Sequence, residues 1–296
     1  MVYNEPGLVI PLHSLRARVT LTPAPVPVLM APDLDLELPL ASAVAENHPL
    51  VQTLYTALEW LLQRDLPAFT YKVSSDIPIK RGMGSGTAIS CAIFKALETY
   101  YQFAPSDRKA EAFAQQMDTL YHGQPSGIDA AVIAHQRAIC FQKTPEGPHS
   151  AGPHIEHLRH LPRLHLVIGD TGPARPTAEV VASVAADYTQ NPNLPDIVRA
   201  IGQEVRQAKD HLIRQDLKAF GECLWRNHGY LQALGVSTPA LNQLVDLARE
   251  HGALGAKLSG AGMGGVAFAL VENEKQAEHL ANVWEKHCVK VYACVT

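Results

Sequence analysis

A glycine-rich stretch between an alternating apolar segment and a helical one constrains this chain more than any other feature. Residues 69–75 read FTYKVSS, which is typical of a strand, and residues 78–90 read PIKRGMGSGTAIS. From Ile89 onward, apolar residues recur at the spacing of a buried helical face. The sequence therefore predicts strand, glycine loop and helix in that order. Backbone N–H groups in such a loop can bind phosphate, although a plain tight turn is the alternative on spacing alone.

Neither glycine loop is a dinucleotide-binding motif. The loop from Gly82 to Thr87 does not fit G-x-x-x-x-G-K-[ST], and Thr87 stands where G-x-G-x-x-G needs a glycine. A second loop, GAGMGG at residues 260–265, matches G-x-G-x-x-G, but an apolar strand follows it where that motif needs a helix. The contexts argue against a nicotinamide oxidoreductase. A glycine-rich entry to a strand is the alternative for the second loop.

Two carboxylates lie in the segment DTLYHGQPSGID, residues 118–129. Asp118 and His122 have the i, i+4 spacing that places them on one helical face, and Asp129 follows the next turn. One carboxylate can accept a proton from an alcohol, and another can hold Mg²⁺, which prefers oxygen ligands. With two glycine loops, this favours phosphoryl transfer from a magnesium nucleotide. Taken alone, Asp129 also fits a helix N-cap, and His122 also fits a structural histidine.

The remaining pattern predicts an α+β fold, because strands and helices interleave without strict βαβ alternation. Strands are predicted within residues 8–21, 137–143, 164–172, 264–271 and 290–296, and helices within 49–64, 107–121, 176–251 and 273–286. In the helix predicted within 107–121, the residues expected to point inward are Phe113, Met117, Leu120 and Tyr121. The Pro-, Gly- and His-rich residues 144–162 are predicted as a loop and a domain boundary.

Charge and cysteine content narrow the partners and the compartment. The 296 residues carry a net charge of −4, which lacks the basic excess typical of nucleic-acid or anionic-membrane partners. No apolar run approaches the roughly 20 residues that span a bilayer. The five cysteines are scattered and show no C-x-x-C spacing. We therefore expect a cytoplasmic protein in a reducing compartment, with no nucleic-acid and no membrane partner.

Taken together, these segments resemble the GHMP small-molecule kinases. PIKRGMGSGTA is similar to the family's ATP loop, and KLSGAGMGG is similar to its C-terminal glycine motif. HGQPSGID, DTGPARPT and NHGYLQALGVSTPALNQL are similar to segments of the mevalonate kinases within this family. The resemblance implies a two-domain fold. Residues 1–160 would form an ATP-binding α+β domain with a left-handed crossover, and residues 161–296 would form a ferredoxin-like domain.

The resemblance also implies an activity, ATP-dependent phosphorylation of the C5 hydroxyl of (R)-mevalonate with Mg²⁺, and it allows a homodimer. Asp129 matches the catalytic aspartate, and Asp118 stands where the family usually has a metal-binding glutamate, with Ser85 as a second metal ligand. His122 and Thr171 would contact the substrate. The implied ATP-binding residues are Pro78, Lys80, Arg81, Gly82, Met83, Gly84, Ser85, Gly86, Thr87 and Ala88, and the implied site-shaping loop comprises Ser259, Gly260, Gly262 and Gly264. The alternatives are a family member acting on phosphomevalonate, homoserine or a sugar, and a nucleotide binder without turnover.

The chain departs from the family pattern in two places. Gly86 stands where a second serine usually helps to bind Mg²⁺, so Thr87, Ser85 or water would have to replace that hydroxyl. The family's first strand, with its PGK-like lysine, is not found, and MVYNEPGLVIPLHSL is similar to the stretch that follows it. We expect either a shortened chain or a short form that has lost activity or replaced the lysine, with Lys80 as the nearest candidate. A missing strand would expose a sheet edge and lower stability.

Overall fold

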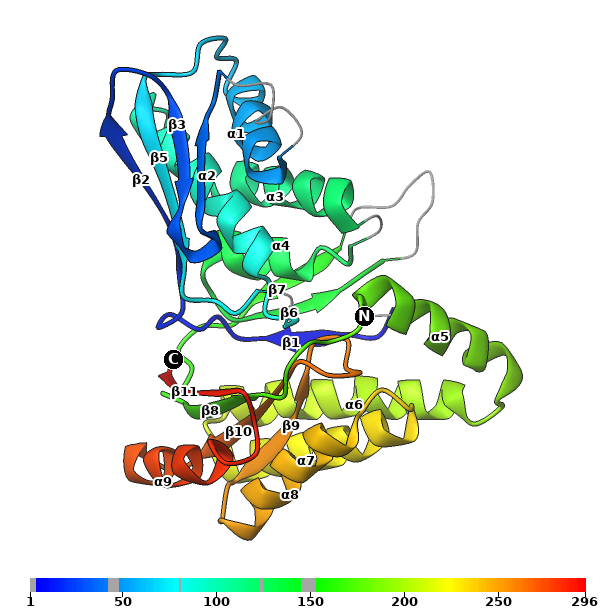
Figure 1. The fold of residues 1–296 in the computed structure, drawn as a ribbon. Helices are drawn as coiled ribbons and strands as arrows, with labels where there is room; N and C mark the ends of the chain where they lie inside the picture. The colour runs from blue at the N-terminus through cyan, green and yellow to red at the C-terminus, as the bar shows by residue number, and fades with distance from the viewer. Residues whose placement is uncertain (1–3, 42–47, 80, 123–124, 145–152) are drawn as a thin grey trace. The chain divides into compact units, whose positions relative to one another are not determined.

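The chain forms two compact units in the computed structural model, which describes residues 4–41, 48–79, 81–122, 125–144 and 153–296 (Figure 1). The N-terminal unit comprises Leu15–Ile79 and Gly84–Gln136. The C-terminal unit comprises Met1–Ser14, Lys80–Met83 and Arg137–Thr296. Each unit is therefore assembled from separate stretches of sequence. The predicted domain boundary at residue 160 stays a prediction.

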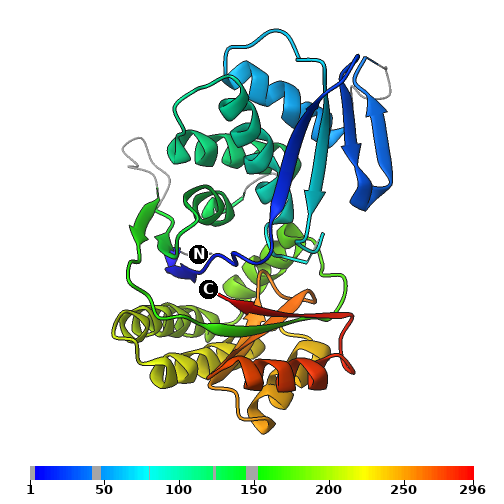
Figure 2. The ribbon, with the colours of Figure 1, turned by 90° about the vertical axis from the view of Figure 1, so that its left-hand side faces the viewer.

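The N-terminal unit is a four-stranded sheet with helices on one face (Figures 1 and 2). The strand order is β2-β5-β3-β4, in which β3 runs parallel to β5 and the other pairs are antiparallel. The predicted succession of strand, glycine loop and helix is confirmed, because β5 precedes the loop and α2 follows it. The elements are β2 (Ala17–Pro23), β3 (Val28–Ala31), β4 (Leu36–Pro39), β5 (Phe69–Ser75), α1 (Pro49–Trp60), α2 (Ser85–Tyr100), α3 (Asp107–His122) and α4 (Ile128–His135), with a 3₁₀ turn η2 (Pro32–Leu34).

Aromatic rings fill the core of the N-terminal unit. Phe94 of α2 and Phe113 of α3 stack with their centroids 4.9 Å apart, and the Trp60 ring meets both edge-on. Met117, one turn beyond Phe113, is fully buried, as helical spacing predicts. The prediction that Leu120 also points inward is wrong, since its side chain is 60% exposed. It lies at the margin of an apolar stripe centred on the fully buried Ala110, Phe113, Ala114 and Met117.

The main sheet of the C-terminal unit has the order β11-β8-β10-β9, with all neighbours antiparallel. Helices separate β8 from β9 and β10 from β11, so the succession is β-α-β-β-α-β with extra helices in the first crossover. This is the ferredoxin-like arrangement, which confirms that part of the predicted fold. The elements are β8 (His165–Asp170), α5 (Thr177–Gln190), α6 (Leu194–Ile213), α7 (Leu217–Ala233), α8 (Pro239–Glu250), β9 (Gly255–Ser259), β10 (Val266–Val271), α9 (Glu274–Trp284) and β11 (Lys290–Val295).

The core of the C-terminal unit centres on Trp284, the last residue of α9. Its side chain is fully buried, and its indole N–H donates to the carbonyl oxygen of Leu244 at 3.0 Å. Leu244 belongs to α8, whose ends follow the predicted caps. The Thr238 hydroxyl accepts from the Leu241 N–H at 3.3 Å, and Gly252 adopts φ +75° just past the helix. Local capping residues therefore set the bounds of this helix as predicted.

A second, three-stranded sheet in the C-terminal unit differs from the sequence prediction. Its order is β1-β6-β7, from β1 (Gly7–Val9), β6 (Ile139–Gln142) and β7 (His154–His157). The prediction of one early strand within residues 8–21 is wrong, because β1 ends at Val9 and β2 begins only at Ala17, in the other unit. Pro11 lies between them and has no N–H to donate to a sheet. The strand β7 also lies within the predicted loop 144–162.

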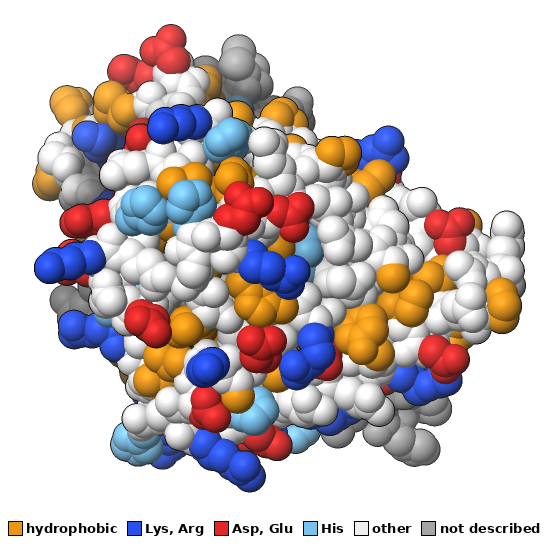
Figure 3. Space-filling view, turned by 90° about the horizontal axis from the view of Figure 1, so that it is seen from below, with side chains coloured by type: hydrophobic (Ala, Val, Ile, Leu, Met, Phe, Trp, Pro, Cys, Tyr) orange, Lys and Arg blue, Asp and Glu red, His pale blue; other side chains and the backbone are white. Residues whose placement is uncertain are grey.

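The surface over the helices of the C-terminal unit mixes both signs of charge (Figure 3). Three ion pairs in this unit illustrate the mixture: Arg226 with Glu204, Lys209 with Glu156, and Arg206 with Glu5. No helix in the described part of the chain has the length and apolar character needed to cross a membrane.

Candidate functional site

The glycine loop ends at the start of α2. Gly84 is the N-cap of this helix, with φ +68°, and no side chain caps the first turn. The first backbone N–H groups of a helix have no acceptor within it, and the helix dipole adds partial positive charge there. In this helix these groups belong to Gly84, Ser85, Gly86 and Thr87, because the Ala88 N–H already donates to the Gly84 carbonyl oxygen at 2.9 Å. The arrangement suits a bound anion such as phosphate.

Asp118 of α3 lies against this first turn. The Thr87 hydroxyl donates to the Asp118 carboxylate, at 2.9 Å from each of its two oxygens. Both side chains are buried, with 4% exposure for Thr87 and 5% for Asp118. A buried charge is expensive without polar partners, so this hydrogen bond helps to retain the carboxylate beside the loop. The structure thus brings together two residues that the sequence predicts for ATP and metal binding.

Asp129 also lies against the glycine loop. A Cβ atom added at Gly84 would stand 3.5 Å from the Asp129 carboxyl carbon and 3.1 Å from Cδ1 of Ile133. Asp129 lies in the first turn of α4, whose N-cap is Gly127 with φ +89°. The alternative that Asp129 is itself the N-cap is therefore wrong. Two carboxylates, from α3 and α4, lie beside the start of α2.

The residues just before Gly84 belong to the C-terminal unit and contact a different set of partners there. Arg81 donates from Nε to Oδ2 of Asp170 at 2.8 Å. The loop at residues 260–265 approaches the same stretch, because a Cβ at Gly260 would lie 3.2 Å from the carbonyl oxygen of Gly82. The two glycine loops of the sequence are therefore neighbours in this unit.

Thr171 continues from Asp170 and is tied to the second glycine loop. Its backbone N–H and its hydroxyl both donate to the carbonyl oxygen of Gly265, each at 2.8 Å. Gly262 and Gly264 leave no room for a side chain, since an added Cβ would lie 2.2 Å from the Val236 carbonyl oxygen and 2.5 Å from that of Pro173. Close backbone packing thus fixes the shape of this loop.

The predicted site residues fall into two groups by unit. Lys80 lies outside the described residues, and so does the side chain of His122, the last residue of α3. In the N-terminal unit lie Pro78, Gly84, Ser85, Gly86, Thr87, Ala88, Asp118 and Asp129. In the C-terminal unit lie Arg81, Gly82, Met83, Thr171, Ser259, Gly260, Gly262 and Gly264.

Sequence reasoning missed Asp170. It is 3% exposed at the end of β8 and holds Arg81 of the loop. The signal for Asp170 is an acidic residue at the end of the apolar strand HLVIGD. Charged residues are almost never fully buried unless paired, so this position predicts a partner for the carboxylate.

The donor set beside the glycine loop fits magnesium. Mg²⁺ is commonly held by one or two carboxylates together with substrate phosphates and water. The Asp118 carboxylate and the Thr87 hydroxyl are oxygen donors of this kind, in contact with each other. Across the described residues, no three His, Cys, Asp or Glu side chains gather as a metal-binding group.

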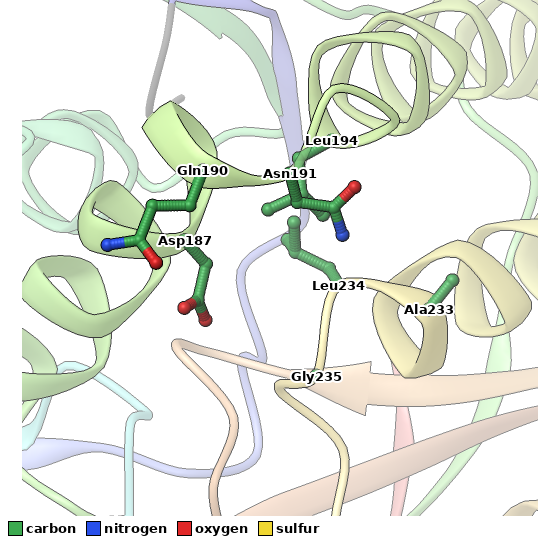
Figure 4. A pocket seen from close by; sticks show the side chains of 7 residues that line it. All are labelled: Asp187, Gln190, Asn191, Leu194, Ala233, Leu234 and Gly235. Carbon is green, nitrogen blue, oxygen red and sulfur yellow. The ribbon is translucent and has the colours of Figure 1, made fainter.

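A separate pocket of about 320 Å³ opens elsewhere in the C-terminal unit, where the end of α5, the start of α6 and the turn after α7 meet (Figure 4). None of the predicted site residues lines it. Its lining consists of Asp187, Gln190, Asn191, Leu194, Ala233, Leu234 and Gly235.

Comparisons with known proteins agree with these motifs. The family model for the GHMP kinases N terminal domain matches residues 51–137, and the model for GHMP kinases C terminal matches residues 208–290. Together they cover more than half of the chain. The segment matched by the first model includes the glycine loop, Asp118 and Asp129. The segment matched by the second includes the loop at residues 260–265.

Individual curated relatives are named mevalonate kinase. The mevalonate kinase of Thermococcus sibiricus is 34% identical over 71% of this chain and 61% of its own length. That of Pyrococcus furiosus is 35% identical over 69% of this chain and 60% of its own length. The chain thus spans about three fifths of these curated relatives.

The fold is also shared with solved structures. An L. major mevalonate kinase in complex with R-mevalonate superposes with a TM-score of 0.84 at 24% identity, covering 100% of this chain and 90% of that one. Motifs, both family models and fold lead to one conclusion: this chain belongs to the GHMP kinase family.

Proposed function

We propose that this chain transfers the γ-phosphoryl group of ATP to the C5 hydroxyl of (R)-mevalonate, giving ADP and 5-phosphomevalonate. The observation that carries the proposal is the contact of two carboxylates, Asp118 and Asp129, with the glycine loop and the first turn of α2. The names of the relatives support mevalonate as the acceptor. ATP and mevalonate are thus the proposed small-molecule partners.

The loop binds the ATP phosphates in this proposal. The uncapped N–H groups at the start of α2 and the dipole of a 16-residue helix favour an anion there. Glycines at 82, 84 and 86 allow phosphate oxygens to approach the backbone. The residues proposed to take part are those predicted from the sequence, Pro78 and the stretch from Lys80 to Ala88.

Asp118, Thr87 and Ser85 would hold Mg²⁺. The hydrogen of the Thr87 hydroxyl goes to Asp118, which leaves oxygen lone pairs on Thr87 for a cation. Thr87 therefore replaces the hydroxyl that Gly86 lacks. When bound with the nucleotide, the metal supplies charge neutralisation on the phosphate oxygens.

Asp129 acts as the general base. Its carboxylate takes the proton from the C5 hydroxyl while that oxygen forms a bond to the γ-phosphorus and the bond to the β–γ bridging oxygen breaks. ADP leaves with that oxygen, so charge and atoms balance. Phosphoryl transfer needs mostly positioning and charge neutralisation, which a single base and a set of backbone donors can provide.

Thr171 and His122 would position mevalonate. Thr171 is fixed by its two hydrogen bonds to Gly265, so the place of its side chain is determined before substrate binds. A homodimer and a cytoplasmic location stay predictions.

The test is ADP release by the whole chain with a panel of acceptors: mevalonate, phosphomevalonate, homoserine and galactose. We expect turnover with mevalonate alone. Asp129→Asn should lower kcat roughly 10²-fold or more, the range for a positioned base. Asp65→Asn, an exposed carboxylate in the same unit, is the matched control and should leave kcat unchanged. Turnover with another acceptor instead of mevalonate would show that this acceptor is the substrate. ATP binding without any turnover would favour a nucleotide binder.

A further inference from the structure

The glycine loop carries a positively charged side chain, Arg81, whose position the structure describes. It stands directly before Gly82 and donates from Nε to Oδ2 of Asp170 at 2.8 Å. Its side chain is 20% exposed, and that of Asp170 is 5% exposed. A partly buried ion pair is screened less than one on the surface. The guanidinium is therefore held in a defined place beside the loop.

Asp170 is itself fixed from several directions. It ends β8, the strand that lies between β10 and β11, and it pairs with Val266 on one side and Lys290 on the other. Its second carboxylate oxygen, Oδ1, accepts from the Gly172 N–H at 2.8 Å. Its backbone oxygen accepts from the Val289 N–H at 2.7 Å. The carboxylate that orients Arg81 is thus rigidly mounted on the sheet.

The backbone of Arg81 is held as well. A Cβ at Gly265 would lie 2.9 Å from the Arg81 carbonyl oxygen. The two backbone segments therefore lie against each other with no side chain between them. The next residue, Gly82, also lies near the second glycine loop, because a Cβ at Gly260 would stand 3.2 Å from its carbonyl oxygen. The contacts of its side chain and backbone leave Arg81 little conformational freedom. Less conformational entropy is therefore lost when a ligand binds to it.

Most of the guanidinium is left for another partner. Arginine has five N–H donors in a planar fork, and Asp170 takes the one on Nε. Among the described residues, no acceptor is recorded for the two terminal amino groups of Arg81. The planar fork of a guanidinium suits phosphate oxygens, which it can bind bidentately. A phosphate bound at the loop would supply the missing acceptors.

The geometry points to Arg81 as a phosphate-binding residue of the nucleotide site, with Asp170 as the positioning residue that holds its Nε and leaves its terminal amino groups for the phosphates. This inference rests on the proposed use of ATP. The rival role is structural: the ion pair would only hold the loop in shape.

The test compares ligands with and without phosphates on the whole chain. Calorimetric binding of ATP and ADP, with adenosine measured by competition, is compared between the unchanged protein and Arg81→Gln. We expect at least roughly tenfold weaker ATP and ADP binding, the range for hydrogen bonds to charged groups, with adenosine unaffected. Arg81→Lys should recover part of the loss, since it restores the charge but not the fork. Arg18→Gln, which removes an exposed ion pair with Asp76, is the control and should bind all ligands normally.

Asp170→Asn tests the positioning role. The amide oxygen can still accept from Gly172, but its NH₂ group cannot accept from Arg81. We expect weaker ATP binding and, in the double variant with Arg81→Gln, no further loss, because the two residues act through one contact. Melting temperatures of all variants report folding separately.

Each outcome decides the question. Equal ATP affinity in Arg81→Gln and the unchanged protein overturns the inference, and so does an equal loss of ATP and adenosine, which would mark a structural role. If ATP binds through Arg81 but mevalonate is not phosphorylated, the proposed function fails and the phosphate site stands. If the unchanged protein binds no ATP, both fail.

Discussion

Gly84 shows how one residue joins local backbone needs to the chemistry of the site. It adopts a left-handed backbone conformation that is unfavourable for residues with a Cβ atom. Its lack of a side chain also makes room for Asp129 and Ile133, which an added Cβ would contact. The glycine pattern alone predicted the loop and the helix after it, because those depend on neighbours in sequence. That Asp129 would lie against Gly84 could not be predicted from spacing, since both α2 and α3 lie between the two residues in the sequence. The carboxylate segment singled out Asp129 as a candidate base, and the resemblance to a family gave it the catalytic role.

Replacing Gly84 separates backbone strain from crowding. Gly84→Ala should lower stability by about 1–2 kcal/mol for the left-handed backbone and also weaken ATP binding, because the new methyl group meets Ile133 and Asp129. Gly235→Ala is the matched control: its φ is +78°, but nothing lies within 4 Å of an added Cβ. Melting temperatures and ATP affinity of both variants check this. Equal ATP affinity in the two variants would contradict a close fit at Gly84.

His228 offers a test by pH. It is 3% exposed; its Nδ1 accepts from the Leu258 N–H at 3.3 Å, and its Nε2 lies 3.2 Å from Oδ1 of Asn242. An Nδ1 that accepts is unprotonated, and burial lowers the pKa of this imidazole below its usual value near 6.5. Below that value the unfolded chain binds a proton that the folded chain does not. Stability should therefore be full above about pH 7 and fall as the pH drops below 6.5.

The measurement is the melting temperature at several pH values between 5.5 and 8, compared with His228→Gln. We expect the unchanged protein to lose more stability on acidification than the variant, because only it carries this group. Titration of His228 by NMR gives an independent readout. A pKa at or above 6.5 would show that the neutral ring is not what the fold favours.

Among the elements, local signals predicted those whose ends are set by neighbours in sequence. Thr238 and Gly252 bound α8 as expected, because caps act on the adjacent turn. The strands β3, β4 and β7 were not predicted, since each has only four residues and gains its hydrogen bonds from strands distant in sequence. Sheet pairing of this kind depends on tertiary context more than on propensity.

The packing of α7 on β9 gives the sharpest prediction at this scale. A Cβ at Gly221 would lie 2.1 Å from the carbonyl oxygen of Leu254, so backbone meets backbone there. Gly221→Ala should destabilise the protein by about 1–3 kcal/mol or more, the usual range for overpacking. Gly229→Ala, on the same helix with nothing within 4 Å, should instead stabilise it by up to about 1 kcal/mol. Chemical denaturation measures both, and similar effects of the two substitutions would contradict the close contact.

At the scale of the whole molecule, the two units do not correspond to two continuous halves of the chain. Residues near the N-terminus belong to the C-terminal unit, where β1 pairs with β6 and Glu5 accepts from Arg206 at 2.9 Å. The sequence alone could not reveal this, because β1 and β6 are short and far apart along the chain. The α+β class could be predicted from the interleaving of strands and helices, and the ferredoxin-like sheet from the family motifs, which occur in the right order.

A fragment test follows from that discontinuity. Residues 137–296 expressed alone lack β1, which leaves one edge of β6 unpaired. We expect the fragment to melt at a lower temperature than the whole chain, and a peptide of residues 4–14 to raise its melting temperature in a concentration-dependent way. A scrambled peptide of the same composition is the control. An equal effect of both peptides would show that the strand pairing contributes nothing.

The aromatic residues of the two cores also give the molecule a built-in optical readout. The chain has three tryptophans: Trp60 packs edge-on against Phe94 and Phe113 in the N-terminal unit, whereas Trp225 and the fully buried Trp284 belong to the C-terminal unit. Trp60 is 37% exposed, so its emission should lie at longer wavelength than that of Trp284. With Trp225 and Trp284 replaced by phenylalanine, fluorescence would follow the N-terminal unit alone. The loss of order in the N-terminal unit could then be followed separately in the intact chain.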